Sequence, residues 1–155
     1  MLSDISHLKN ICRPNQRLMG IDYGTKRIGV ALSDTLRSMA TPHTVLHRTR
    51  LRVDLEALFA IHDQMNVSGW VIGLPLNMDG TEGSRCQSTR QFVKNILELR
   101  DIPVILHDER LSSIAVERTM IVADLSRSKR AKCVDQAAAA FILQGVLDAF
   151  KRYPE

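Results

Sequence analysis

Three acidic residues stand at the ends of apolar segments, where a soluble domain usually keeps uncharged side chains. Asp22 ends the run in "RLMGIDYG", Glu109 ends the run in "VILHDER", and Asp135 comes just before four consecutive alanines at positions 137–140. A charge buried there without a partner is costly, so each carboxylate needs compensation. Each alone has a structural explanation: Asp22 as a turn cap, Glu109 as a partner of Arg110, Asp135 as an acidic residue at a helix N-terminus.

The three carboxylates together favour a metal site. In an open α/β sheet, functional groups gather beyond the carboxyl ends of the strands, where Asp22 and Glu109 are expected and where a covering helix can bring Asp135. Carboxylates that meet at one point repel one another unless a cation lies between them. Mg²⁺ and Mn²⁺ accept carboxylate oxygens while keeping waters and substrate phosphates. We therefore predict a Mg²⁺ or Mn²⁺ site formed by Asp22, Glu109 and Asp135.

Residues suited to phosphate binding flank these carboxylates. The predicted substrate contacts are Gly24, Thr25, Lys26, Arg27, Asn77, Arg110, Lys129, Arg130 and Lys132. The amides of the Gly24–Thr25 turn are expected to face a phosphate, and residues 124–132 are expected to form a basic loop. The alternatives are a solvated loop for the basic segment and simple turn formation for Asn77. His107, close to Glu109, is either a proton carrier or a packing residue.

The periodicity of the chain alternates between strands and helices. Residues 17–22, 27–34 and 40–48 predict three strands joined by tight turns, and Pro42 favours an edge position for the third. A helix is expected over 49–66, a buried strand over 69–75, a helix from about Ser84 and a fifth strand over 102–109. A short helix is expected over 112–123, and a long one from near Cys133. The predicted fold is α/β: a mixed five-stranded sheet, with a three-stranded antiparallel meander and two parallel strands, flanked by helices.

Composition is that of one ordinary globular domain. The chain has 155 residues, 45% of them hydrophobic and 25% charged, with a net charge of +4 and a pI near 9.2 that favours a polyanionic partner. Three scattered cysteines without a C-x-x-C pair indicate reduced thiols in a cytoplasmic protein. Neither a signal peptide nor an apolar run of about 20 residues is present, so no membrane association is expected. Residues 1–16 are expected to be a loose N-terminal extension of a domain over 17–155.

Four motifs in this order resemble those of the YqgF family: "GIDYGTKRIGVALSD", "VIGLPLNMDGTEG", "LHDERLSS" and "VDQAAAAFIL". The resemblance extends from Leu18 to Leu147. Members are bacterial ribonuclease H-like proteins, described both as Holliday junction resolvases and as nucleases that process the 5′ end of pre-16S rRNA. The resemblance implies a ribonuclease H-like fold and a metal-dependent nuclease site, and the family's acidic positions fall on Asp22, Glu109 and Asp135.

Phosphodiester hydrolysis assisted by two metal ions fits this set of residues. Asp22 would bridge both ions, and Glu109 and Asp135 would each complete one site. The expected partner is nucleic acid, pre-rRNA before branched DNA, with ribosomal particles as a further partner. The oligomeric state stays open, because a two-fold symmetric junction requires a dimer and rRNA processing does not.

Two rival interpretations belong to other classes of protein. "DYGT" also resembles the phosphate loop of actin-like and sugar-kinase ATPases, but these need two such domains, and Glu109 and Asp135 would then have no role. A non-catalytic RNA- or ribosome-binding module would keep the scaffold without needing buried carboxylates.

Overall fold

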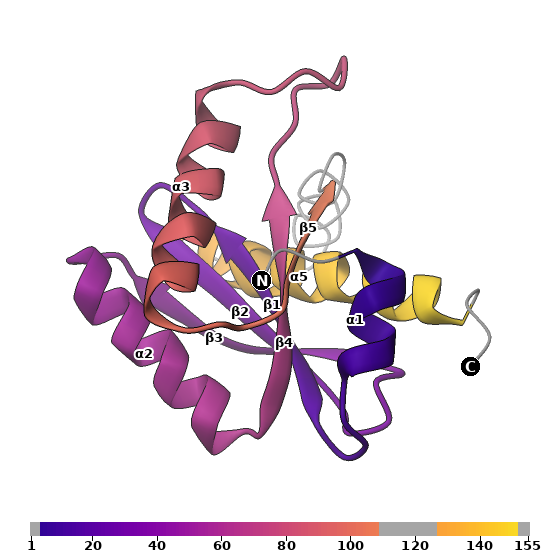
Figure 1. The fold of residues 1–155 in the computed structure, drawn as a ribbon. Coiled ribbons are helices and arrows are strands. Elements are labelled where there is room, and N and C mark those ends of the chain that lie inside the picture. The colour runs from indigo at the N-terminus through magenta and orange to yellow at the C-terminus, as the bar shows by residue number, and fades with distance from the viewer. Residues whose placement is uncertain (1–3, 109–126, 152–155) are drawn as a thin grey trace.

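The computed structural model describes residues 4–108 and 127–151 (Figure 1). The strands are β1 (Arg17–Tyr23), β2 (Arg27–Ser33), β3 (Ala40–His47), β4 (Val67–Leu74) and β5 (Val104–Asp108). The helices of the described part are α1 (Ile5–Ile11), α2 (Leu51–Gln64), α3 (Ser84–Leu99) and α5 (Arg127–Phe150). None of these helices is long and apolar enough to cross a membrane.

The five strands form one mixed sheet in the order β3-β2-β1-β4-β5. β1 pairs antiparallel with β2, and β2 antiparallel with β3, whereas β4 runs parallel to both β1 and β5. The predicted meander and the two parallel strands are therefore confirmed. β3 lies at an edge, as Pro42 indicated, and the pairing register shifts by one residue beside Pro42.

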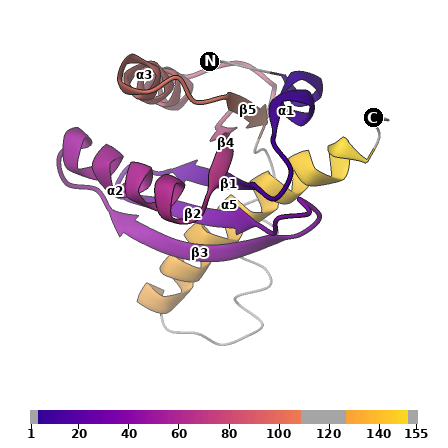
Figure 2. The same cartoon turned by 60° about the horizontal axis from the view of Figure 1, so that its bottom comes forward.

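Helices cover both faces of the sheet (Figures 1 and 2). α2 and α3 lie on one face, where Leu58 and Phe92 join a core that includes fully buried Trp70. α5 crosses the opposite face and packs with Leu18 and Val71 in a second core. Alternate residues of β1 thus serve two different layers, as the two-residue period of a strand requires.

Glycines on the sheet let the backbone of α5 come unusually close. A Cβ atom added at Gly29 on β2 would lie 2.1 Å from the carbonyl oxygen of Asp135, and one at Gly20 on β1 would lie 2.7 Å from that of Ala139. The alanines of residues 137–140 supply the matching small surface on the helix. Glycine and alanine at these positions therefore set how near α5, and with it Asp135, sits to β1 and β2.

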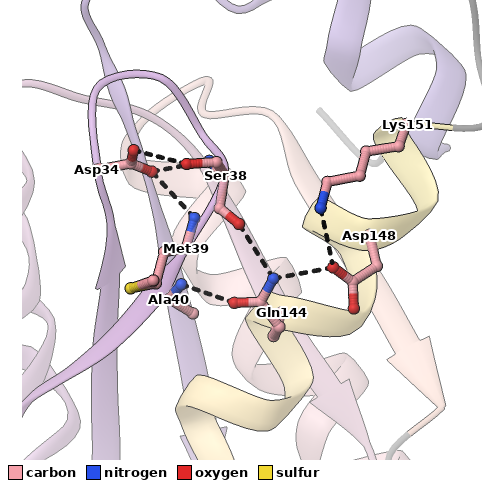
Figure 3. Close-up of polar contacts among 7 residues, drawn as sticks. All are labelled: Asp34, Ser38, Met39, Ala40, Gln144, Asp148 and Lys151. Carbon is pink, nitrogen blue, oxygen red and sulfur yellow. Dashed lines mark hydrogen bonds and ion pairs between the residues drawn. The ribbon is translucent and has the colours of Figure 1, made fainter.

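Gln144 ties α5 to the turn between β2 and β3 (Figure 3). Its Oε1 accepts a hydrogen bond from Ala40 N at 2.8 Å, and its Nε2 donates to Ser38 O at 3.1 Å. Asp34 stabilises the turn itself, because its Oδ1 accepts from the amides of Ser38 and Met39. The helix is thus held at its middle by apolar packing and farther along by these polar contacts.

The expectation of a loose N-terminal extension is wrong for residues 5–11, which form α1. Leu8 is completely buried in the α5-side core, and its Cδ1 fills the space over Gly69 of β4. Lys9 Nζ also donates to the carbonyl of Phe150, the last residue of α5, at 2.8 Å. Contacts far along the chain therefore stabilise a helix of only seven residues, which is too short to be stable alone.

The start of the last helix also differs from the prediction. α5 begins at Arg127 rather than near Cys133, so Lys129, Arg130 and Lys132 belong to a helix and not to a basic loop. A charged segment without apolar periodicity gives no signal for a helix, but arginine and lysine are good helix formers and extend one that tertiary packing already holds. The short helix expected over 112–123 lies outside the described residues.

Replacing Gly29 by alanine tests the close contact of α5 with the sheet. The added methyl group overlaps the Asp135 carbonyl, so the helix must move, and we expect a loss of about 1–3 kcal/mol in the free energy of unfolding. Gly83→Ala is the control, because a Cβ there meets only the Asn77 side chain at 3.5 Å. Denaturant titrations of the two variants compare the losses. Equal small losses would show that α5 is not tightly seated.

A second prediction concerns pH. Trp70 Nε1 donates to His62 Nδ1 at 2.9 Å, which requires that nitrogen to be unprotonated, and burial lowers the pKa of His62. The unfolded chain therefore binds more protons than the folded chain as the pH falls through about 6.5, and stability decreases in that window. Urea titrations at several pH values should show a shallower decrease for His62→Gln, which keeps an acceptor for Trp70. The variant His43→Gln, at an exposed position, should behave like the parent; identical slopes in all three proteins would contradict the prediction.

Candidate active site

Asp22 faces α5 because of its position in β1. Gly20, two residues earlier, contacts α5, whereas Ile21 and Tyr23 point into the core beneath α2 and α3. Residues two apart in a strand share a face, so Asp22 lies on the side of the sheet that α5 covers. It is half-buried near the carboxyl end of β1, where the sheet no longer shields it completely.

Asp22 and Asp135 line the same hollow. Its volume is about 270 Å³, and its lining residues are Asp22, Gly24, Thr25, Lys26, Arg27, Arg85 and Asp135. The structure therefore brings together two of the three predicted acidic residues, the predicted turn residues 24–26 and Arg27 at the start of β2. Glu109 and Arg110 lie outside the described residues. β5 ends at Asp108, which pairs with Leu74 at the carboxyl end of β4.

Arg27 balances the charge of Asp135. Its Nε donates to Asp135 Oδ2 at 2.5 Å, and the two side chains are 32% and 20% exposed. Arg27 begins β2, and α5 comes close to that strand at Gly29, so this ion pair follows from the same close packing. A residue predicted to bind substrate is here a partner of a predicted metal ligand.

The turn between β1 and β2 has a more restricted role than predicted. The Gly24 amide donates to the carbonyl of Arg27 at 2.9 Å, and a Cβ at Gly24 would lie 2.6 Å from that oxygen. Gly24 therefore closes the hairpin, and its amide is already used. Thr25 and Lys26 are exposed at the tip of the turn, beside the hollow.

Two arginines that sequence reasoning missed support this turn. Arg85, in the first turn of α3, lines the hollow and donates from Nη2 to the carbonyl of Tyr23 at 3.2 Å. Arg48, just after β3, donates from Nη1 to the carbonyls of Gly24 and Thr25 at 3.0 and 3.1 Å. Both are distant from Asp22 in sequence and fall in segments that look like ordinary solvated surface, so no local pattern distinguishes them.

Two other predicted residues lie apart from the hollow. Asn77, in the loop that projects beyond β4 (Figure 1), forms hydrogen bonds with Thr81 through both its main chain and its side chain. Turn formation, the alternative considered for Asn77, accounts for these bonds. The half-buried His107 packs against Gly145 of α5, where an added Cβ would lie 2.8 Å from Nε2, and burial lowers the pKa of its ring.

The hollow is chemically suited to a hard cation. Asp22 and Asp135 offer carboxylate oxygens, and a space of about 270 Å³ leaves room for a Mg²⁺ ion that keeps several of its waters. Within residues 4–108 and 127–151, no group of three His, Cys, Asp or Glu side chains is assembled. Asp22 and Asp135 are thus chemically suited to such an ion, and Glu109, the third predicted ligand, lies outside the described residues.

This strand order, with helices on both faces of the sheet, is a ribonuclease H-like fold, and comparison with known structures agrees. The fold is similar to that of Thermus thermophilus RuvC in complex with a Holliday junction, with a TM-score of 0.54 and 12% identity over 88% of this chain and 96% of that one. The Holliday junction resolvase of yeast mitochondria has a TM-score of 0.52 and 14% identity over 96% of this chain and 86% of its own.

The chain belongs to the RuvX family. Residues 16–149 match the family model described as "RuvX: Holliday junction resolvase". A relative from Paramagnetospirillum magneticum is 54% identical over 134 residues, which is 86% of each chain. One from Phenylobacterium zucineum is 49% identical over 150 residues, or 96% of each chain. Both relatives are named "Putative pre-16S rRNA nuclease". RuvX and YqgF are two names of one family, so the predicted family is confirmed.

The ion pair between Arg27 and Asp135 predicts how the site responds to metal. In Arg27→Gln, the competing cation is gone, so we expect Mg²⁺ to raise the thermal unfolding midpoint at lower concentration than in the parent. At ten times its dissociation constant, Mg²⁺ stabilises the folded state by about 1.4 kcal/mol. Arg52→Gln is the matched control, because it removes an arginine that pairs with Glu56 on the solvent-exposed side of α2. A larger Mg²⁺ requirement in Arg27→Gln would mean that Arg27 assists metal binding.

Proposed function

We propose that this chain is a cytoplasmic hydrolase that cleaves phosphodiester bonds at the 5′ end of pre-16S rRNA. The observation that supports this most is the shared hollow, where Asp22 and Asp135 lie beside exposed Lys26 and the guanidinium of Arg85. Carboxylates and cations together suit a site that must hold both a metal ion and an anionic phosphate. The RNA substrate is proposed from the names of relatives about 50% identical to this chain.

Asp22, Asp135 and Glu109 are the proposed ligands of one or two Mg²⁺ or Mn²⁺ ions. When bound, such ions supply an activated water and stabilise the leaving oxygen in an in-line displacement. The residues of the chain position the substrate. Arg85 and Lys26 are placed to bind phosphate oxygens, and Arg27 balances Asp135 when no metal is bound. Lys129, Arg130 and Lys132, in the first turns of α5, would add phosphate contacts before Asp135.

Cleavage of branched DNA is the second candidate. The description of the family model as a Holliday junction resolvase favours it. The same carboxylates would act, but a junction presents two strands related by symmetry, so two copies of the chain would be needed. A test therefore offers both substrates to the same preparation.

The test combines a 16S rRNA precursor transcript with its 5′ leader and, in parallel, a four-way DNA junction. With Mg²⁺ the parent should shorten the transcript at its 5′ end, as primer extension would show, and EDTA should stop the reaction. Cleavage of the junction alone would select the second candidate. Binding of RNA without any cleavage would identify a non-catalytic RNA-binding module.

Asp22→Asn separates a metal ligand from an architectural residue. The amide keeps the size of the side chain but loses the charge, so we expect cleavage to fall by more than about 100-fold while the metal-free protein unfolds at the same temperature or higher. The variant should also lose most of the stabilisation by Mg²⁺. Asp63→Asn, at the exposed end of α2, is the matched control and should cleave normally. Destabilisation of Asp22→Asn, with a parent indifferent to Mg²⁺, would make Asp22 a structural residue.

A further inference from the structure

A second hollow of about 520 Å³ lies on the α2 and α3 side of the turn between β1 and β2. Tyr23 and Phe92 form its apolar base, Arg48 lines it from the chain that leads into α2, and Leu51 lines it from the first turn of α2. The remaining lining comes from one polar side of α3: Ser84, Gln87, Ser88, Gln91 and Asn95. Figure 2 shows α2 and α3 on the same face of the sheet.

This second hollow adjoins the candidate active site through the chain itself. Asp22 lines the first hollow and the next residue, Tyr23, lines the second. In the same way, Arg85 lines the first hollow and the preceding residue, Ser84, lines the second. The two hollows therefore lie on either side of the turn between β1 and β2 and of the first turn of α3. A nucleic-acid strand that passes over this turn would therefore contact both hollows.

Arg48 is held rigidly beside this hollow. Its Nη1 donates to the carbonyls of Gly24 and Thr25, and its Cζ lies 4.4 Å above the ring centroid of Tyr23. In the part of the chain that the structure describes, no carboxylate forms an ion pair with Arg48. A guanidinium has five N–H donors, and those on Nε and Nη2 are not needed for these contacts. Arg48 is thus an exposed cation fixed in one orientation, which lowers the entropy cost of binding an anion.

The chemistry of the lining favours a sugar–phosphate backbone over stacked bases. The Tyr23 ring is covered by Phe92 on one face, with centroids 4.0 Å apart and planes 6° apart, and by Arg48. Neither face is therefore open for base stacking. The polar side of α3 offers neutral hydroxyl and amide groups, and no acidic residue lines the hollow. Such groups bind phosphate and sugar oxygens with little dependence on sequence.

We propose that the groove formed by Arg48 and the side of α3 with Gln87 and Gln91 binds the RNA strand next to the phosphate that is cleaved. This inference rests on the proposed function, which supplies the cleavage site from which the strand extends. Arg48 would hold one phosphate. Gln87 would donate to the following sugar and phosphate oxygens, as would the second N–H of Gln91, whose Nε2 also donates to Asn95 Oδ1 at 3.0 Å. The groove would thereby fix the direction in which the strand crosses the active site.

The test measures binding of fluorescent single-stranded RNAs of increasing length to the full chain by anisotropy, with EDTA present to prevent cleavage. Affinity should rise once an RNA is long enough to leave the first hollow. Arg48→Gln and Gln91→Glu should each weaken binding of the long RNAs by about 3- to 10-fold and leave the shortest unaffected. For Arg48→Gln, the slope of log affinity against log salt should shrink by about 0.7 for the lost phosphate.

Lys94→Gln is the matched control, because it changes the net charge by the same amount on the same helix but outside the groove. It should bind long RNAs like the parent. Gln91 is exposed on α3, so Gln91→Glu tests the groove without threatening the fold. If both groove variants match Lys94→Gln, the inference is wrong even where Mg²⁺-dependent cleavage persists. Absence of cleavage together with the predicted loss of binding would refute only the proposed function.

Discussion

Close packing of α5 on β1 and β2 is the contact on which the candidate site depends. A methyl group at Gly29 or Gly20 would overlap carbonyl oxygens of the helix, so side chains are excluded where the backbones meet. Because the helix lies so near, Asp135 reaches the hollow that Asp22 lines and the guanidinium of Arg27. A helix held at an ordinary distance by larger side chains would move Asp135 away from the hollow that Asp22 lines.

Arginine side chains around the turn between β1 and β2 bring positive charge next to the carboxylates of the candidate site. Arg85 donates to the carbonyl of Tyr23, and Arg48 donates to those of Gly24 and Thr25, so two positive charges lie beside this turn. Arg27 neutralises Asp135 from the other side. The hollow and its surroundings thus combine carboxylates with hydrogen-bonded guanidinium groups, a combination that suits the proposed hydrolysis of phosphodiester bonds.

The order and type of most elements followed from local patterns. Alternation in β2, the continuous apolar run of β4 and the helical spacing of Phe92, Val93 and Ile96 in α3 depend only on neighbouring residues, and the structure has these elements. α1 and the first turns of α5 were missed because their stability comes from distant contacts. Leu8 is apolar but isolated in a polar segment, and only the core beneath α5 makes it a buried anchor.

The candidate site likewise has features that follow from local sequence and features that depend on distant contacts. The sequence alone predicted that Asp22, Asp135 and residues 24–27 would lie together, and all of them line one hollow. A carboxylate at the end of an apolar run and a short Gly-Thr-Lys-Arg segment are local features. The ion pair of Arg27 with Asp135, and the presence of Arg48 and Arg85 beside the turn, were decided by the tertiary structure. These partners are separated by 23 to 108 positions along the chain, and exposed arginines have no pattern that tells which carbonyl or carboxylate they will meet once the sheet and helices pack.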